Sequence, residues 1–219
     1  MTADIRPVAV PKVPLVRSGR DEAAPPGAWL DRHLEDLARG LGSLHRQAGL
    51  LEGWGRHLAD VLQSGGRLLV AGNGGSAAQA QHLTAELVGR FLEERRPFSA
   101  LCLSAETSTL TALVNDYGAE EMFARQVQAH GRAGDVLVLL STSGRSPNLL
   151  VAAERAAAGG LTVWALTGPR GNPLAEIAGE ALCVEARATA TVQEVHLVAV
   201  HAICAAVDAR LRQVAVVAR

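Results

Sequence analysis

The sequence predicts an α/β fold: a doubly wound, five-stranded parallel sheet with flavodoxin-like strand order and an N-terminal helical extension. Two observations predict it. Short runs that are apolar throughout alternate with helical segments of crossover length, which is typical of a parallel sheet covered on both faces. Hydrophobic residues make up 48% of the 219 residues and aromatic residues only 3%, so we expect a core built mainly from Ala, Val and Leu.

The N-terminal region divides into an arm and a helical part. Residues 1–27 contain five prolines, which disfavour regular structure, so we expect a flexible or extended arm. From residue 28 to about residue 64, apolar residues recur three and four positions apart. This pattern predicts two helices, or one helix disturbed near Gly49, and a partner subunit is a candidate surface for burying their apolar stripe. We expect residues 28–219 to form a single domain that includes these helices.

The alternation of strands and helices begins at about residue 67. The expected strands cover residues 68–71, 98–103, 136–140, 162–166 and 181–184. The expected helices that separate and follow them cover residues 76–89, 107–115, 120–130, 147–159, 173–178 and 191–213.

Composition excludes several classes of function. The formal net charge of −1 provides no field that attracts nucleic acid or anionic lipid. The single lysine, Lys12, lies in the arm, which argues against Schiff-base, pyridoxal-phosphate and P-loop chemistry. No uninterrupted apolar run reaches the roughly 18 to 20 residues that span a bilayer, and the N-terminus is no convincing signal peptide. We therefore expect a cytoplasmic protein with no nucleic-acid or membrane partner.

Two loops that follow strands and open helices are candidates for anion binding. The glycine loop, residues 72–76, reads Gly-Asn-Gly-Gly-Ser, and its free N–H groups can face an anion. It does not match the dinucleotide fingerprint, so we expect no nucleotide cofactor, and a plain turn is an equal alternative. The hydroxyl loop, residues 141–146, has four hydroxyls, more than helix capping needs, and can hold phosphate oxygens without lysine.

Two pairs of side chains on predicted helices are candidates for catalysis. His82 and Glu86 are four positions apart, so their side chains share a helix face. Gln193 and His201 are eight positions apart and lie roughly on one stripe, whereas His196 lies on another face and is expected to be structural. Either pair alone is more often a surface or capping feature. Both pairs in one cleft would suit proton transfer or a divalent metal, but the sequence does not show that they meet.

The chain resembles the sugar isomerase (SIS) domain family from about residue 28 to residue 211, and within it the branch that isomerises phosphoheptoses. The motifs are GNGGS at 72–76, H-x-x-x-E-L-x-G-R at 82–90, Asn-Asp at 115–116, G-D-V-L at 134–137, STSGRS at 141–146, L-T-G at 166–168 and Q-E-x-H-x-x-x-x-H at 193–201. The resemblance implies an aldose–ketose isomerase that interconverts sedoheptulose 7-phosphate and D-glycero-D-manno-heptose 7-phosphate through an enediol.

The same resemblance implies the roles of individual residues. Glu86 is the expected base at carbon, and His201 handles the oxygen proton and assists ring opening. The substrate-binding residues that it implies are Asn73, Gly74, Ser76, Arg90, Asn115, Asp116, Ser141, Thr142, Ser143, Ser146 and Gln193. Residues that bind zinc in some members match His82, Glu86, Gln193 and His201. A carboxylate that ligates Zn²⁺ fully cannot abstract a proton at the same moment, so the two roles of Glu86 compete. A homotetramer with active sites at subunit interfaces is also implied.

A non-catalytic branch of the family resembles the chain over the same span. Its members bind the bacterial replication initiator protein, and in them the helix carboxylate and the final histidine are replaced. This chain retains Glu86 and His201, which favours an enzyme. A module that binds a sugar phosphate or a protein partner without catalysis is the alternative.

Overall fold

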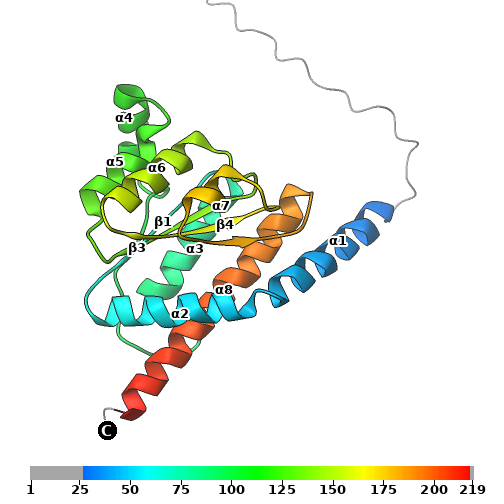
Figure 1. Ribbon diagram of the computed structural model, residues 1–219, viewed down its shortest axis with the longest axis horizontal. Helices are drawn as coiled ribbons and strands as arrows, with labels where there is room; N and C mark the ends of the chain where they lie inside the picture. Colours follow the sequence, from blue (N-terminus) through cyan, green and yellow to red (C-terminus); the bar gives the residue numbers. More distant parts are fainter. Residues whose placement is uncertain (1–26, 218–219) are drawn as a thin grey trace, which may run out of the picture.

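The computed structural model of the protein describes residues 27–217, with side chains as far as residue 214. In this part of the chain, five parallel strands form one sheet in the order β2-β1-β3-β4-β5 (Figure 1). This order is flavodoxin-like, so the predicted fold class is confirmed. The strands are β1 (Leu68–Gly72), β2 (Ala100–Cys102), β3 (Val136–Ser141), β4 (Thr162–Thr167) and β5 (Glu180–Cys183). The predicted arm, apart from Gly27, lies outside the described residues.

The helices form one layer on each face of the sheet (Figure 1). Successive strand residues point to opposite faces, so Leu68 and Val70 join one core cluster while Leu69 and Ala71 join the other. The first layer contains α1 (Ala28–His45), α2 (Ala48–Gln63), α3 (Gly75–Val88) and α8 (Thr189–Val217). The second layer contains α4 (Thr107–Tyr117), α5 (Glu121–His130), α6 (Pro147–Ala158) and α7 (Pro173–Ile177).

The prediction for the second strand is too long. Strand β2 covers only Ala100–Cys102, whereas the apolar run predicted a strand over residues 98–103. The N–H of Phe98 donates to the carbonyl of Leu87 at 3.1 Å, so Phe98 belongs to the connection from α3. Apolar side chains at 98 and 103 mark burial, but they do not fix where strand pairing begins.

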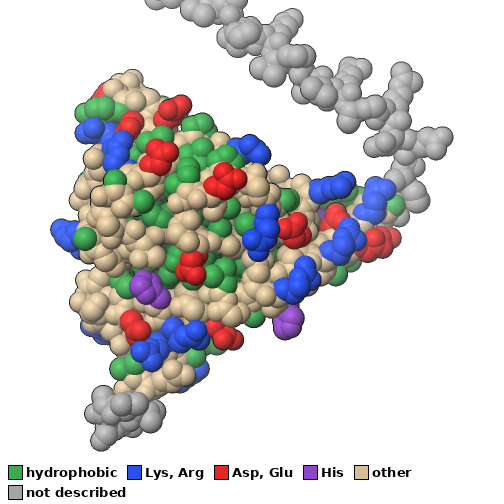
Figure 2. Space-filling view, viewed as in Figure 1, with side chains coloured by type: hydrophobic (Ala, Val, Ile, Leu, Met, Phe, Trp, Pro, Cys, Tyr) green, Lys and Arg blue, Asp and Glu red, His purple; other side chains and the backbone are tan. Residues whose placement is uncertain are grey.

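The structure has two N-terminal helices, the first of the two predicted alternatives, and the interruption lies at Arg46 and Gln47, just before Gly49. The Gln47 side chain donates to the carbonyl of Cys183 at 2.8 Å and accepts from the N–H of the same residue at 3.3 Å. These bonds fasten the break to strand β5 at the edge of the sheet. On the N-terminal side of the break, α1 extends away from the sheet (Figure 1). Its Trp29 and Leu34 side chains are exposed. Figure 2 shows acidic and basic side chains interspersed along α1.

Helix α8 is long and apolar enough, by length and composition alone, to cross a membrane over Thr189–Val214. Half of the apolar 18-residue stretch within it is buried in the protein. At Gly55 of α2, a Cβ atom would overlap the Cβ of Ala206, so α2 and α8 pack in close backbone contact. This burial is typical of a core helix, and it makes α8 the neighbour of both α2 and α3.

Candidate active site

The glycine loop and the hydroxyl loop lie side by side at the carboxyl edge of the sheet. Strands β1 and β3 are neighbours, and the chain order reverses there, which is where α/β sheets bind ligands. Asn73 and Asn148 exchange two amide hydrogen bonds of 3.0 Å across the loops. At Gly75, a Cβ atom would meet the Gln193 side chain at 2.6 Å. A glycine at this position therefore lets Gln193 of α8 pack on the first turn of α3.

The hydroxyl loop is shaped partly by its own serines. The buried Ser141 Oγ accepts from the N–H of Gly144 at 3.1 Å, and Ser143 Oγ accepts from the N–H of Arg145 at 3.2 Å. Gly144 has φ +62°, and a Cβ there would overlap the side chain of Asn172. Ser146 is the N-cap of α6, yet its hydroxyl makes no capping hydrogen bond. Pro147 has no N–H, and the N–H of Leu149 donates to the carbonyl of Ser146 at 3.0 Å, so the groups available to an anion here are the Ser146 hydroxyl and the N–H of Asn148.

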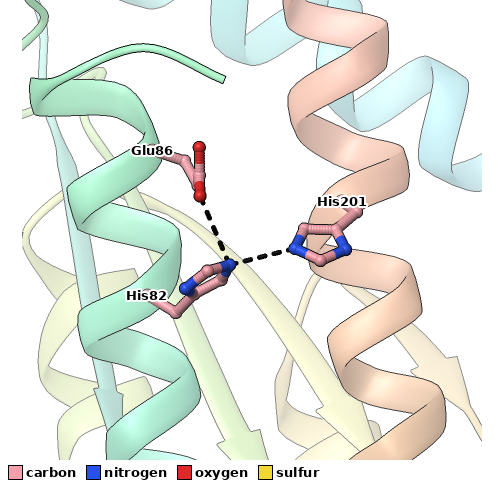
Figure 3. A group of neighbouring side chains, drawn as sticks. All are labelled: His82, Glu86 and His201. Carbon is pink, nitrogen blue, oxygen red and sulfur yellow. Dashed lines mark hydrogen bonds and ion pairs between the residues drawn. The ribbon is translucent and has the colours of Figure 1, made fainter. Parts of the chain in front are cut away.

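His82 and Glu86 of α3 meet His201 of α8, as Figure 3 shows. His82 Nε2 lies 2.9 Å from His201 Nε2 and 3.3 Å from Glu86 Oε1. Helices α3 and α8 both start at the carboxyl edge of the sheet. His82 lies about two turns into α3 and His201 about three turns into α8, so the two helices meet with an offset of about one turn. The two pairs singled out in the sequence thus meet at His82, Glu86 and His201, which we call the triad.

The surroundings of the triad keep it reachable but fixed. The side chains of His82 and Glu86 are 41% and 20% exposed. The ring of Phe91 stacks on the His201 imidazole, with 5.6 Å between centroids. Burial, with the nearby Glu86 and Asp208 carboxylates, raises the pKa of the Cys204 thiol to about 12. Cys204 therefore stays protonated at neutral pH and is no nucleophile.

The triad is a possible metal site. Within the described part of the chain, it is the one group of three or more His, Cys, Asp or Glu side chains whose ligand atoms converge, all within 4.8 Å of one another. His82 Nε2 faces an imidazole nitrogen and a carboxylate oxygen, and a single N–H cannot satisfy both well. Two nitrogens and one oxygen are ligands that Zn²⁺ accepts, and tetrahedral ligand atoms at about 2.0–2.1 Å lie about 3.3 Å apart. The residues present therefore fit a divalent metal.

Comparison with known proteins agrees with this architecture. A family model for the SIS domain matches residues 33–168, a span that includes both loops, His82 and Glu86. The chain belongs to the SIS domain family. A phosphoheptose isomerase of Streptomyces coelicolor is 63% identical over 181 residues, which is 83% of this chain and 78% of that protein. Another, from a Bradyrhizobium species, is 45% identical over 183 residues, covering 81% and 92% of the two chains.

Solved structures give the same relationship. The phosphoheptose isomerase of Neisseria gonorrhoeae superposes with a TM-score of 0.75 at 36% identity, covering 82% of this chain and 97% of that chain. The enzyme of Francisella tularensis gives a TM-score of 0.76 at 32% identity, covering 82% and 96%. Within the SIS domain family, the chain therefore groups with the phosphoheptose isomerases.

Other residues of the motifs shared with the SIS domain family lie away from the triad. Gln193 lies about two turns before His201 on α8, and its carbonyl accepts from the Gln79 side chain. Asn115 donates to Asp116 at 2.7 Å at the exposed end of α4, in the opposite helical layer. Arg90 is exposed just beyond α3. A single chain does not bring Asn115 and Asp116 to the triad.

Residues of the Q-E-x-H-x-x-x-x-H motif on α8, at 193–201, contact different partners. Glu194 binds His33 of α1 at 2.9 Å. His196 is fully buried and bonds the carbonyl of Thr167 at 3.1 Å, which fits the structural role expected for it. Burial lowers the pKa of His196 to about 4, so its imidazole is neutral at neutral pH. This motif therefore positions α8 as well as supplying His201.

Several residues around the site had no sequence signal that singled them out. Asn148 ends the segment that begins with the hydroxyl loop, and nothing in the sequence indicated that it binds Asn73. Asn172 caps α7 through the N–H of Ala175 and packs on Gly144, and only its position before Pro173 marks it as a helix start. Phe91 lies in a segment without periodicity, so its stacking on His201 could not be expected.

Proposed function

We propose that this SIS-domain protein is an aldose–ketose isomerase that interconverts sedoheptulose 7-phosphate and D-glycero-D-manno-heptose 7-phosphate. The observation that carries the proposal is the meeting of the Glu86 carboxylate and the His201 imidazole on two helices that begin beside the anion-binding loops. High identity to proteins named phosphoheptose isomerase supports the same activity.

The proposed reaction moves a proton between C1 and C2 of the open-chain sugar. Glu86 removes the carbon-bound proton, exchanges it with solvent and delivers a proton to the neighbouring carbon, while His201 transfers the proton between the two oxygens. The intermediate is an enediol, so the bonds to carbon and oxygen change without any external oxidant. The exposed fractions of His82 and Glu86 leave the site open to substrate.

The substrate phosphate binds at the hydroxyl loop, beside the N-terminal end of α3 and away from Glu86. Ser141, Thr142, Ser143 and Ser146, with the N-terminus of α6, supply its ligands. Glu86 lies ten residues after Ser76, which is about 15 Å along α3. This separation favours a long open-chain sugar phosphate, and binding of the remote phosphate holds the reacting carbons in place. Asn73, Asp116 and Gln193 bind sugar hydroxyls in this proposal, and Arg90 adds a charge-assisted contact.

We further propose that His82, Glu86 and His201, with Gln193, hold one Zn²⁺ per subunit. The metal, when bound, polarises substrate oxygens and stabilises negative charge on them. The protein residues still have to hold and move the protons, and His82 orients the site in either case.

The wider context of the protein is also a proposal. The exposed apolar side chains of α1, among them Trp29 and Leu34, support burial by other copies in a homotetramer with sites completed at interfaces. Residues 28–219 are taken as one SIS domain, and the protein as cytoplasmic. The non-catalytic alternative is not favoured, because Glu86 and His201 are both present.

A product assay tests the function. Purified protein is incubated with seven-, six- and five-carbon ketose phosphates, with and without a chelator, and the aldoses are measured by NMR. We expect conversion of sedoheptulose 7-phosphate in preference to the shorter sugars, with loss on chelation and recovery with Zn²⁺. If none of the ketose phosphates is converted, the isomerase proposal is wrong; if chelation changes nothing, the metal proposal is wrong.

A further inference from the structure

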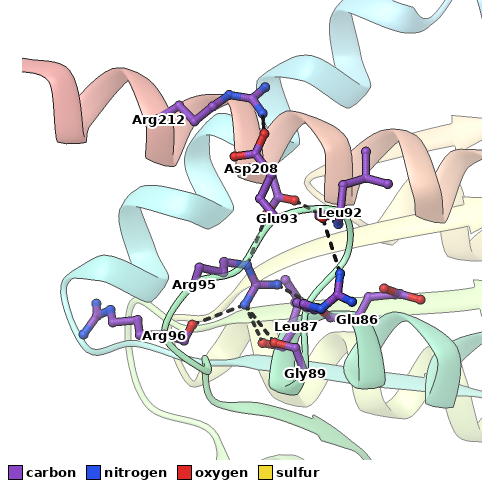
Figure 4. Close-up of polar contacts among 10 residues, drawn as sticks. Glu86, Leu87, Gly89, Leu92, Glu93, Arg95, Arg96, Asp208 and Arg212 are labelled. Atoms are coloured by element: carbon purple, nitrogen blue, oxygen red, sulfur yellow. Dashed lines mark hydrogen bonds and ion pairs between the residues drawn. The ribbon is translucent and has the colours of Figure 1, made fainter.

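Arg95 and Asp208 form a nearly buried ion pair close to Glu86, as Figure 4 shows. Arg95 Nε donates to Asp208 Oδ1 at 3.2 Å, and the two side chains are only 10% and 4% exposed. Desolvating two charges is costly, so a buried pair is weak evidence for stability by itself. Its remaining contacts indicate a different role.

Arg95 closes the C-terminal end of α3. Its Nη2 donates to the carbonyl of Glu86 at 2.7 Å, and its Nη1 donates to the carbonyls of Leu87 and Gly89 at 3.0 Å and 3.4 Å. The last carbonyls of a helix have no partner within the helix, and a positive charge there is favourable. The guanidinium thus holds the backbone of Glu86, the proposed base.

Asp208 joins this cap to α8. It lies seven residues after His201, which is about two turns, so the two side chains are on the same side of the helix. His201 meets His82 at one level, and Asp208 meets Arg95 at the next. Helices α3 and α8 are therefore tied at two levels, one in the triad and one below it.

Asp208 also holds the segment that covers His201. Its Oδ2 accepts from the N–H of Leu92 at 3.4 Å. The preceding residue, Phe91, stacks on the His201 imidazole. One carboxylate therefore fixes both the end of α3 and the ring that packs on His201.

We propose that Arg95 and Asp208 are positioning residues, which set the Glu86 carboxylate against the His201 imidazole by locking α3 to α8. Neither side chain belongs to the triad, and both act through it. The kinetic consequence rests on the proposed isomerase function. Misplacing reacting groups by about 1 Å costs up to about 10²-fold in rate. The hydroxyl loop lies at the other end of α3, so phosphate binding is independent of this pair.

The test compares two ion pairs that each have one member on α8, and removes the carboxylate from each in turn. Asp208→Asn keeps the shape but removes the buried charge, whereas Asp60→Asn breaks the exposed Asp60–Arg210 pair, whose side chains are 51% and 34% exposed. We expect Asp208→Asn to lower kcat about 10- to 100-fold with KM within about twofold. Asp60→Asn should leave both constants within about twofold, since exposed pairs contribute little.

A second readout needs neither activity nor metal. The ring protons of His201 feel the ring current of Phe91, so their NMR resonances should move in Asp208→Asn and stay in Asp60→Asn. If the wild type proves inactive on every sugar phosphate, this shift still tests the positioning role. The two proposals can therefore fail separately.

Two further variants keep the test decisive if Asp208→Asn folds poorly. Asp208→Glu restores the carboxylate and should regain most of kcat. Arg95→Lys keeps the charge, but its single nitrogen cannot bond Asp208 and the α3 carbonyls together as the three guanidinium nitrogens do, so it should lower kcat selectively. Wild-type kcat and unmoved His201 resonances in Asp208→Asn overturn the proposal. A rise in KM alone also overturns it, as does failure of all three variants to fold, measured by circular dichroism.

Discussion

The anion-binding half and the catalytic half of the site are built differently. The glycine loop and the hydroxyl loop are each continuous in sequence, and each follows a buried strand. In the catalytic half, His82 and His201 are 119 positions apart and meet only because α3 packs on α8. The first half depends on local backbone shape, and the second on packing between distant helices. Changes in the first should alter substrate binding, and changes in the second should alter turnover.

The largest effect is expected at the base. Glu86→Gln removes the carboxylate that takes the carbon-bound proton but keeps the size of the side chain. We expect kcat to fall about 10⁴-fold, the upper end for a positioned acid or base, while the substrate dissociation constant changes little. Steady-state kinetics and calorimetric binding measure the two quantities. Near-normal turnover in this variant would remove Glu86 from the mechanism.

The next largest effect is expected at the imidazole. His201→Asn keeps a hydrogen-bonding group but cannot shuttle a proton near neutral pH, so we expect kcat to fall about 10²-fold. Since His201 is also a proposed metal ligand, Zn²⁺ content is measured on the same sample. An unchanged kcat in this variant means that His201 plays no part in proton transfer.

A smaller and different effect is expected in the anion-binding half. Ser146 makes no capping bond, so Ser146→Ala should cost little stability. It should raise KM about tenfold, the effect of losing one hydrogen bond to a charged group, with kcat nearly unchanged. Steady-state kinetics on the heptose phosphate measures both constants. A loss confined to kcat would contradict the division between the two halves.

The smallest effect on turnover is expected at His196, which holds α8 against strand β4. Burial lowers the pKa of His196 to about 4 from an ordinary value of about 6.5. The unfolded chain therefore takes up the proton first. Stability is unaffected above pH 6.5 and is lost as the pH falls toward 4, by up to about 3 kcal/mol. In His196→Gln this loss should be absent. Urea unfolding between pH 7.5 and pH 4 measures it, and equal losses in both proteins contradict the assignment.

The five strands and both loops could be predicted from the sequence, because apolar runs and clusters of glycine or hydroxyl residues are local signals. The strand order could be expected from the alternation of these strands with helices of crossover length. Each pair of side chains that shares a helix face could also be predicted, since residues four or eight positions apart lie on one face of a helix. The contact between His82 and His201 could not be predicted from the sequence, because it depends on how α3 packs on α8. Arg95 lies in a charged run and Asp208 in an alanine-rich helix, so nothing in their neighbours marks a buried pair. The exact position of the break between the N-terminal helices, at Gln47, likewise depends on its bonds to Cys183, far along the chain.

Hydrogen exchange at carbon tests the central claim most directly. Wild-type protein and Glu86→Gln are incubated with sedoheptulose 7-phosphate in D₂O, and deuterium at C1 and C2 is followed by NMR. We predict that the wild type incorporates deuterium as it forms the aldose, and that Glu86→Gln binds the sugar without incorporating it. Deuterium incorporation by Glu86→Gln at the wild-type rate would contradict the assignment of the α3 carboxylate as the base.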